Sequence, residues 1–61
     1  MQRSINSVSL IVEYGLSIGL LTEQLLKGSG INRSQLSDSN CHIEDEQELL
    51  VLTNLARLTQ E

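Results

Sequence analysis

The apolar residues of this chain are almost all aliphatic, and this restricts how the chain can build a core. Twelve Leu, five Ile and three Val stand beside a single Tyr, with no Phe and no Trp. A domain of 61 residues buries only about 60% of the surface that its unfolded chain exposes, so its stability is marginal without a cross-link, a metal or a partner. We therefore expect one small unit, residues 1–61, whose core is made of interlocking aliphatic side chains.

Neither a disulfide nor a bound metal is expected to support that core. Cys41 is the single cysteine, so no internal disulfide can form. Cys41 and His42 are adjacent, and neighbouring side chains on extended backbone point to opposite sides. A zinc site needs three or four protein ligands, and only Glu44 or Glu46 stands near enough in the sequence to add to these two. We expect no metal site, no cofactor site and no catalytic residue, so we predict that the chain is not an enzyme.

The charge balance argues against direct binding to nucleic acid. Eight acidic and four basic residues give a net charge of −4 and a pI near 4.7. The four bases are scattered singly along the chain, as Arg3, Lys27, Arg33 and Arg57. Contacts to phosphates dominate the affinity of proteins for nucleic acid, and modules that make them usually present a clustered basic face.

No segment is expected to enter a membrane or to direct export. The longest mostly apolar run, residues 14–21, is about half the length that a bilayer-spanning helix needs. Arg3 could begin a signal peptide, but Glu13 interrupts the apolar stretch and no cleavage site of small residues follows. Together with a free cysteine, these features favour a cytoplasmic location.

Two patterns compete between residues 5 and 18. Apolar residues occupy every even position from Val8 to Leu20, which is the period-two alternation of a half-buried strand. Five apolar residues also recur at the three- and four-residue intervals of a helix, and these are Ile5, Val8, Ile11, Val12 and Leu16. Gly15 and Gly19 would each weaken a helix interior by about 1 kcal/mol. The residue pattern alone leaves strand and helix open.

Short helices are predicted on either side of a glycine turn in the middle of the chain. Thr22 is a suitable N-cap for the first helix, which ends near Lys27, and Gly28 can adopt the left-handed conformation that terminates helices. Asn32 can cap a second short helical turn that holds Leu36.

The same stretch, residues 22–36, has the outline of a helix-turn-helix. Arg33 and Gln35 would lie on its second helix, and both are residue types that can read bases. Asp38 follows closely, and bases are sparse around it. Two packed helices joined by a glycine turn are therefore the favoured interpretation.

The clearest prediction is a long helix from Glu44 to about Thr59. This stretch contains no Gly or Pro, and acidic residues fill its first turns, where the helix dipole favours negative charge. Its apolar stripe is broad, which is typical of a helix that packs against a substantial surface. We predict an interface for packing or association on this helix, formed by Leu49, Leu52, Leu55, Ala56 and Leu58.

An ordered series of glycine and aliphatic positions covers about 50 of the 61 residues. The series consists of Gly19, Leu25-Leu26, Lys27-Gly28, Gly30-Ile31, Leu36, Asp38, Ile43 and residues 47–59. In this order and spacing, the chain resembles the start of the N-terminal, effector-sensing domain of AraC-family transcription regulators, in the branch whose opening is helical.

The resemblance implies a helix for residues 5–18. We therefore expect an all-α fold of three to four short helices joined by glycine turns, with the long C-terminal helix packed across the others. It also implies that the chain is the N-terminal part of a larger regulatory domain, lacking the DNA-binding helix-turn-helix pair. Its role would be to serve as a scaffold for sensing an unidentified small-molecule effector or for self-association.

The expected partners are a second copy of the chain, as a homodimer, or the rest of the regulatory domain. The alternative is a stand-alone helical protein-interaction module or helix-turn-helix module.

Overall fold

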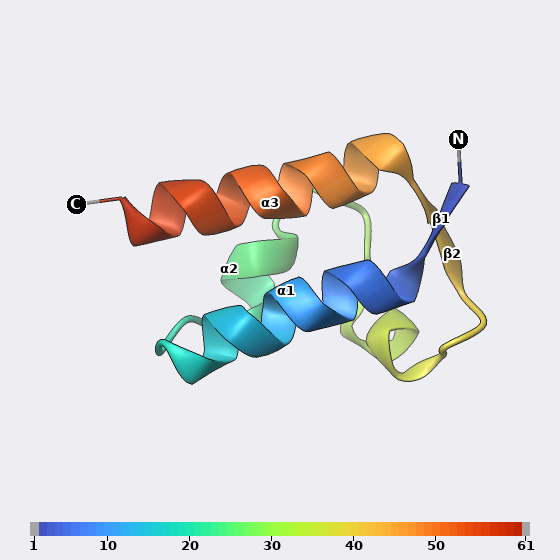
Figure 1. Ribbon diagram of the computed structural model, residues 1–61, viewed down its shortest axis with the longest axis horizontal. Helices are drawn as coiled ribbons and strands as arrows, with labels where there is room; N and C mark the ends of the chain where they lie inside the picture. The colour runs from blue at the N-terminus through green and yellow to red at the C-terminus, as the bar shows by residue number, and fades with distance from the viewer. Residues whose placement is uncertain (1, 61) are drawn as a thin grey trace.

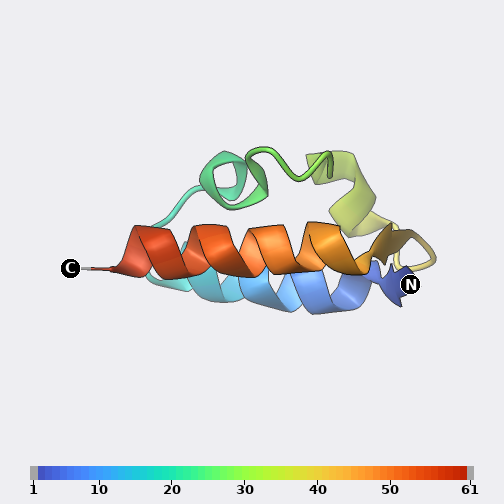
Figure 2. The same cartoon turned by 90° about the horizontal axis from the view of Figure 1, so that it is seen from above.

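The computed structural model describes residues 2–60. Its elements are, in order, β1 (Gln2–Ser4), α1 (Ile5–Ser17), α2 (Thr22–Leu26), the 3-10 helix η1 (Arg33–Ser37), β2 (His42–Glu44) and α3 (Asp45–Thr59). The helices α1 and α3 lie side by side and run in the same direction (Figure 1). The short helices α2 and η1 lie together on one side of this pair (Figure 2). The molecule thus has two layers, and only one side of the α1–α3 pair is covered.

The expectation of an all-α fold is wrong, because β1 and β2 form a two-stranded antiparallel sheet (Figure 1). Its register is Gln2–Glu44, Arg3–Ile43 and Ser4–His42. Ser4 and Glu44 are the N-cap residues of α1 and α3, with ψ of 141° and 154°. An N-cap residue has extended backbone, and the two long helices start next to each other. The extended residues that lead into them therefore lie within pairing distance.

Residues 5–17 form a helix, as the resemblance implied and the alternation did not. Ser4 caps the helix, because its Oγ accepts a hydrogen bond from the Asn6 backbone N at 3.2 Å. The helix buries Ile5, Val8 and Val12. Most apolar residues at the even positions stay exposed, so the period-two pattern does not mark a buried strand face in this protein.

Gly15 allows α1 and α2 to approach closely. It is buried within α1, and a Cβ atom added there would lie 2.5 Å from Cδ1 of the fully buried Leu25. The glycine that weakened the helical prediction is therefore required by the packing of the helix rather than by its backbone conformation.

Aliphatic side chains from α1, α2, β2, α3 and the segment before η1 meet in one core. Its buried members are Ile5, Val8, Val12, Leu25, Leu26, Ile31, Ile43 and Val51. The helix α3 packs against both α1 and α2 and contributes the fully buried Val51.

A glutamine stabilises the start of three helical elements in the same way. Its side-chain Oε1 accepts a hydrogen bond from the backbone N–H three residues earlier, which helix geometry leaves without a partner. The pairs are Gln24 with Leu21 at 2.9 Å, Gln35 with Asn32 at 2.6 Å and Gln47 with Glu44 at 2.8 Å.

The structure shows which residues cap the two short helices. Asn32 is the N-cap of η1, as predicted, but the N-cap of α2 is Leu21, and Thr22 is a buried residue inside the helix. Gly28 adopts a φ of +79°, in the left-handed region expected of it.

Polar contacts join β1 and the first turn of α1 to the first turn of α3. The Arg3 Nε donates to Asp45 Oδ1 at 2.6 Å and lies 3.6 Å from Glu48 Oε1. These contacts raise the pKa of Arg3 above its ordinary value. The hydrogen bond to Asp45 has the largest effect, and the negative charges of Asp45 and Glu48 add to it. The Ser7 Oγ donates to Glu48 Oε2. These contacts fix how far along α1 the helix α3 begins.

Candidate functional site

Side-chain contacts identify the side of α3 that faces the covering layer. The Asn54 Nδ2 donates to two backbone oxygens at the end of α2, Leu25 O at 2.8 Å and Lys27 O at 3.0 Å. The Gln47 Nε2 donates to Ser29 O at 2.9 Å. Within residues 2–60, the other elements therefore leave the side of α3 opposite Asn54 uncovered (Figure 2).

Apolar residues occupy that uncovered side of α3. At 3.6 residues per turn, Leu49, Leu52 and Ala56 lie about 140–160° around the helix from Asn54. Leu49 is 63% exposed and Leu52 is 43% exposed, and Ala56 is also exposed.

The neighbouring helix α1 carries apolar residues on the same side. Leu10 and Tyr14 each stand two positions from the buried Val12, which places them about 160° around the helix from it. They are 67% and 56% exposed. Val12 faces the core between the two layers, so Leu10 and Tyr14 face away from it.

The two sets form one surface. The Ser7–Glu48 hydrogen bond aligns α1 with α3, and one turn further along each helix Ile11 is level with Leu52. Leu10 is thus at about the level of Leu52 on the neighbouring helix. We call the resulting surface the α1–α3 face, and its residues are Leu10, Tyr14, Leu49, Leu52 and Ala56.

The structure places the five predicted interface residues in two groups. Leu49, Leu52 and Ala56 belong to the α1–α3 face. Leu55 is partly buried against the core. Leu58 lies close to the direction of the buried Val51, and it is 36% exposed because it stands near the end of α3. Sequence reasoning missed Leu10 and Tyr14, whose helical positions relative to Val12 could have indicated them.

Two opposite charges lie near the two ends of α3, at the outer edge of the α1–α3 face. They stand about 160–180° around the helix from Glu48, whose side chain bonds to Ser7 of α1. Glu46 is in the first turn and Arg57 is in the last, eleven positions apart, which corresponds to about 16 Å along a helix. Both are exposed. Within residues 2–60, neither side chain has a hydrogen bond or an ion pair.

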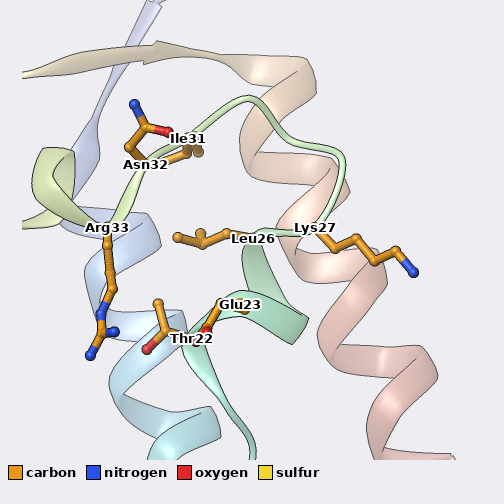
Figure 3. A pocket seen from close by; sticks show the side chains of 7 residues that line it. All are labelled: Thr22, Glu23, Leu26, Lys27, Ile31, Asn32 and Arg33. Atoms are coloured by element: carbon orange, nitrogen blue, oxygen red, sulfur yellow. The ribbon is translucent and has the colours of Figure 1, made fainter.

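Two shallow hollows lie on the opposite side, the first between α2 and the start of η1 and the second where η1 and the start of α2 meet α1. The first has a volume of about 260 Å³. Its lining residues are Thr22, Glu23, Leu26, Lys27, Ile31, Asn32 and Arg33 (Figure 3). The second, of about 300 Å³, adjoins it through Thr22 and Arg33. Figure 3 shows Arg33 extending toward Thr22 while Lys27 points away from the hollow. In a specific ligand site the polar groups usually converge on one point. The polar groups of the first hollow do not.

The segment with a helix-turn-helix outline does not contain a recognition helix. Its second part is η1, a five-residue 3-10 helix, whereas a recognition helix is an α-helix long enough to lie in the major groove. The Gln35 side chain is held within the protein, because it accepts from Asn32 N and its Nε2 donates to Cys41 Sγ at 3.5 Å. This geometry does not favour base reading by Arg33 and Gln35.

Cys41 and His42 do not form a site with other residues. Cys41 is partly buried beside the core, and His42 is exposed on β2. Within residues 2–60, no group of three or more His, Cys, Asp or Glu side chains is arranged to hold a metal ion. Nor is any helix in that range both long and apolar enough to cross a bilayer.

Comparisons with known proteins identify no relative. No family model, no curated protein and no solved structure matches this chain. The α1–α3 face is therefore the candidate site that the geometry itself supports best.

Proposed function

We propose that this chain is a self-association module, in which the α1–α3 face packs against the same face of a second copy. The observation that carries the proposal is that Leu10, Tyr14, Leu49 and Leu52 are exposed on the side of the α1–α3 pair that the elements within residues 2–60 leave uncovered. Contiguous exposed apolar surface of this kind marks interaction sites on soluble proteins.

The size of the face indicates how strong this association is. Two copies would bury eight large side chains that are each about half exposed, and completing the burial of each stabilises the complex by about 1 kcal/mol. The loss of translational and rotational freedom on association costs about 4–15 kcal/mol. At most about 4 kcal/mol remains, so we expect a weak, concentration-dependent dimer with a dissociation constant in the millimolar range.

The charges of α3 favour a second copy as the partner. The middle of the α1–α3 face is uncharged, and it has an acid at one end of α3 and a base at the other. A surface that carries both signs in this way can be complementary to itself, whereas a partner of one charge would be repelled at one end.

We propose further that this association belongs to a transcription regulator of the AraC type. The support is the series of glycine and aliphatic positions from Gly19 to the C-terminal helix, together with the helical state of residues 5–17. In that setting the chain is a scaffold for sensing or association, and it does not itself contact DNA. A mobility-shift assay at physiological salt tests this role, and binding of DNA by this chain alone would contradict it.

Sedimentation equilibrium across a range from micromolar to millimolar tests the proposed association. We expect the wild type to move from monomer to dimer and Leu49→Lys to remain monomeric, because the substitution places a charge in the middle of the interface. Leu21→Lys is the matched control, since Leu21 is 59% exposed but stands at the N-cap of α2. A wild type that stays monomeric throughout would overturn the proposal, as would a dimer that both variants retain.

A further inference from the structure

We infer that the two copies meet with their α3 helices antiparallel, about a two-fold axis that passes near Leu52, so that Glu46 of each chain pairs with the partner's Arg57. This inference rests on the proposed self-association and specifies its geometry.

The positions of the charges along α3 define the register. In an antiparallel pair of identical helices, two residues face each other when the midpoint between them lies on the two-fold axis. The midpoint between Glu46 and Arg57 falls between Val51 and Leu52. An axis there brings both copies of the acid against both copies of the base. Both residues are exposed, and neither forms an ion pair with another of residues 2–60.

Side-chain size supports the same register independently of charge. Leu49 and Ala56 are both on the α1–α3 face, and the midpoint between them falls between Leu52 and Thr53. An axis there lies one residue, or about 1.5 Å, along α3 from the axis that the charges define, and it sets a leucine of one chain against an alanine of the other at two equivalent places. Alternation of large and small side chains lets facing layers interlock.

The helix α1 fits this axis as well. Because the Ser7–Glu48 hydrogen bond aligns the two helices, Leu10 is close to the level of Leu52. A two-fold axis across both helices places α1 against the α1 of the second copy, with Leu10 near the centre. Leu10 and Tyr14, the residues of α1 on this face, are uncharged, so the contact brings no like charges together.

The opposite orientation lacks this complementarity. With the two α3 helices in contact and parallel, Glu46 would stand beside the partner's Glu46, and Arg57 beside the partner's Arg57. Like charges would then meet at both ends of the helix, which is destabilising.

Charge reversal tests the pairing in the full chain. Glu46→Arg and Arg57→Glu should each weaken the homodimer about 3–10-fold, since each converts two attractive contacts into two repulsive ones. An equimolar mixture of the two variants should recover an affinity within about 2-fold of the wild type, because both contacts of the mixed dimer again join an acid and a base.

The matched control for net charge is Glu23→Arg on α2. It makes the same change in net charge as Glu46→Arg, from −4 to −2, but Glu23 lines the hollow on the other side of the molecule. General repulsion between two acidic copies should ease equally in both variants. Only the inferred pairing makes Glu46→Arg weaken the dimer while Glu23→Arg does not.

Cysteine cross-linking tests the position of the axis. In a Cys41→Ser background, Leu52→Cys should form a disulfide-linked dimer under mild oxidation, because a residue near the axis lies close to its own copy, within reach of the Cα separation of a disulfide, about 4.4–6.8 Å. Leu21→Cys should not form one.

The outcomes separate this geometry from the proposed function. A dimer that Leu49→Lys dissociates, but that mixing of the charge variants does not restore and Leu52→Cys does not cross-link, would overturn the antiparallel register and leave the self-association standing. A wild type that is monomeric at all concentrations would overturn both.

Discussion

Gly15 is the residue at which the packing of α1 against α2 depends most on the absence of a side chain. Alanine is a better helix former than glycine by about 1 kcal/mol, so propensity alone predicts that Gly15→Ala stabilises the protein. The added methyl group would lie 2.5 Å from Leu25 Cδ1, inside the core. We expect a net loss of about 1–3 kcal/mol in the free energy of unfolding, typical of an overpacked core.

Urea denaturation followed by circular dichroism measures this loss. Glu13→Ala is the control on the same helix, because Glu13 is exposed and its replacement should leave the free energy of unfolding within about 0.5 kcal/mol of the wild type. A Gly15→Ala variant more stable than the wild type would contradict this expectation, because it would show that the Leu25 side chain makes room for the methyl group at little cost.

At the scale of the elements, the Asn54 side chain links α3 to the end of α2. Its Nδ2 satisfies two carbonyl oxygens that the short helix leaves without partners. Asn54→Asp replaces a donor with a carboxylate that would face the same two oxygens. We expect it to destabilise the protein more than Asn54→Ala, with losses of about 2–3 and about 1–2 kcal/mol respectively.

Thermal or urea unfolding at neutral pH compares the two variants. For the aspartate variant, the two carbonyl oxygens raise the pKa of the new carboxyl in the folded protein. Protonation removes the charge and restores one donor, so the deficit relative to alanine should shrink as the pH falls from that raised pKa towards the ordinary Asp value, near 4. Equal stability of the two variants at neutral pH would mean that the Asn54 amide does not hold the end of α2.

Elements could be predicted from the sequence where local signals were sufficient. The long helix was expected from Glu44 to Thr59 and is found at Asp45–Thr59, because acidic first turns and an uninterrupted apolar stripe are local properties. The positive φ of Gly28 and the cap at Asn32 were also predicted correctly. Each depends on only a few neighbouring residues.

The sheet and the first helix could not be predicted in this way. Each strand has three residues, too few for alternation to show, and the strands pair only because two helices begin side by side. In residues 5–17, the apolar residues matched both the strand period and the helix period. The contact of Gly15 with Leu25 explains why a glycine is tolerated in this helix, but it joins residues ten positions apart and so leaves no local pattern.

Local sequence patterns indicated only the α3 half of the candidate site. The stripe of α3 identified Leu49, Leu52 and Ala56, but it could not separate them from Leu55 and Leu58, because that choice depends on where the rest of the core lies. Leu10 and Tyr14, the α1 half of the face, could be identified only once the position of α1 beside α3 was known.

At the scale of the whole molecule, the aliphatic composition is divided between a small core and an uncovered surface. The core buries eight apolar residues, while large apolar side chains on α1 and α3 remain exposed on one side. A chain of this size gains stability from association. We therefore expect the unfolding temperature of the wild type to rise with protein concentration and that of Leu49→Lys to be independent of it, as calorimetry at several concentrations would show.

The central claim is that the α1–α3 face is where two copies meet, and an NMR dilution series tests it most directly. Amide and side-chain signals of the wild type are followed from millimolar to micromolar concentration. We expect the changes to centre on Leu10, Tyr14, Leu49, Leu52 and Ala56 and to spare the hollow around Thr22 and Arg33. Signals that do not move on dilution, or that move only around the hollow, would contradict the account.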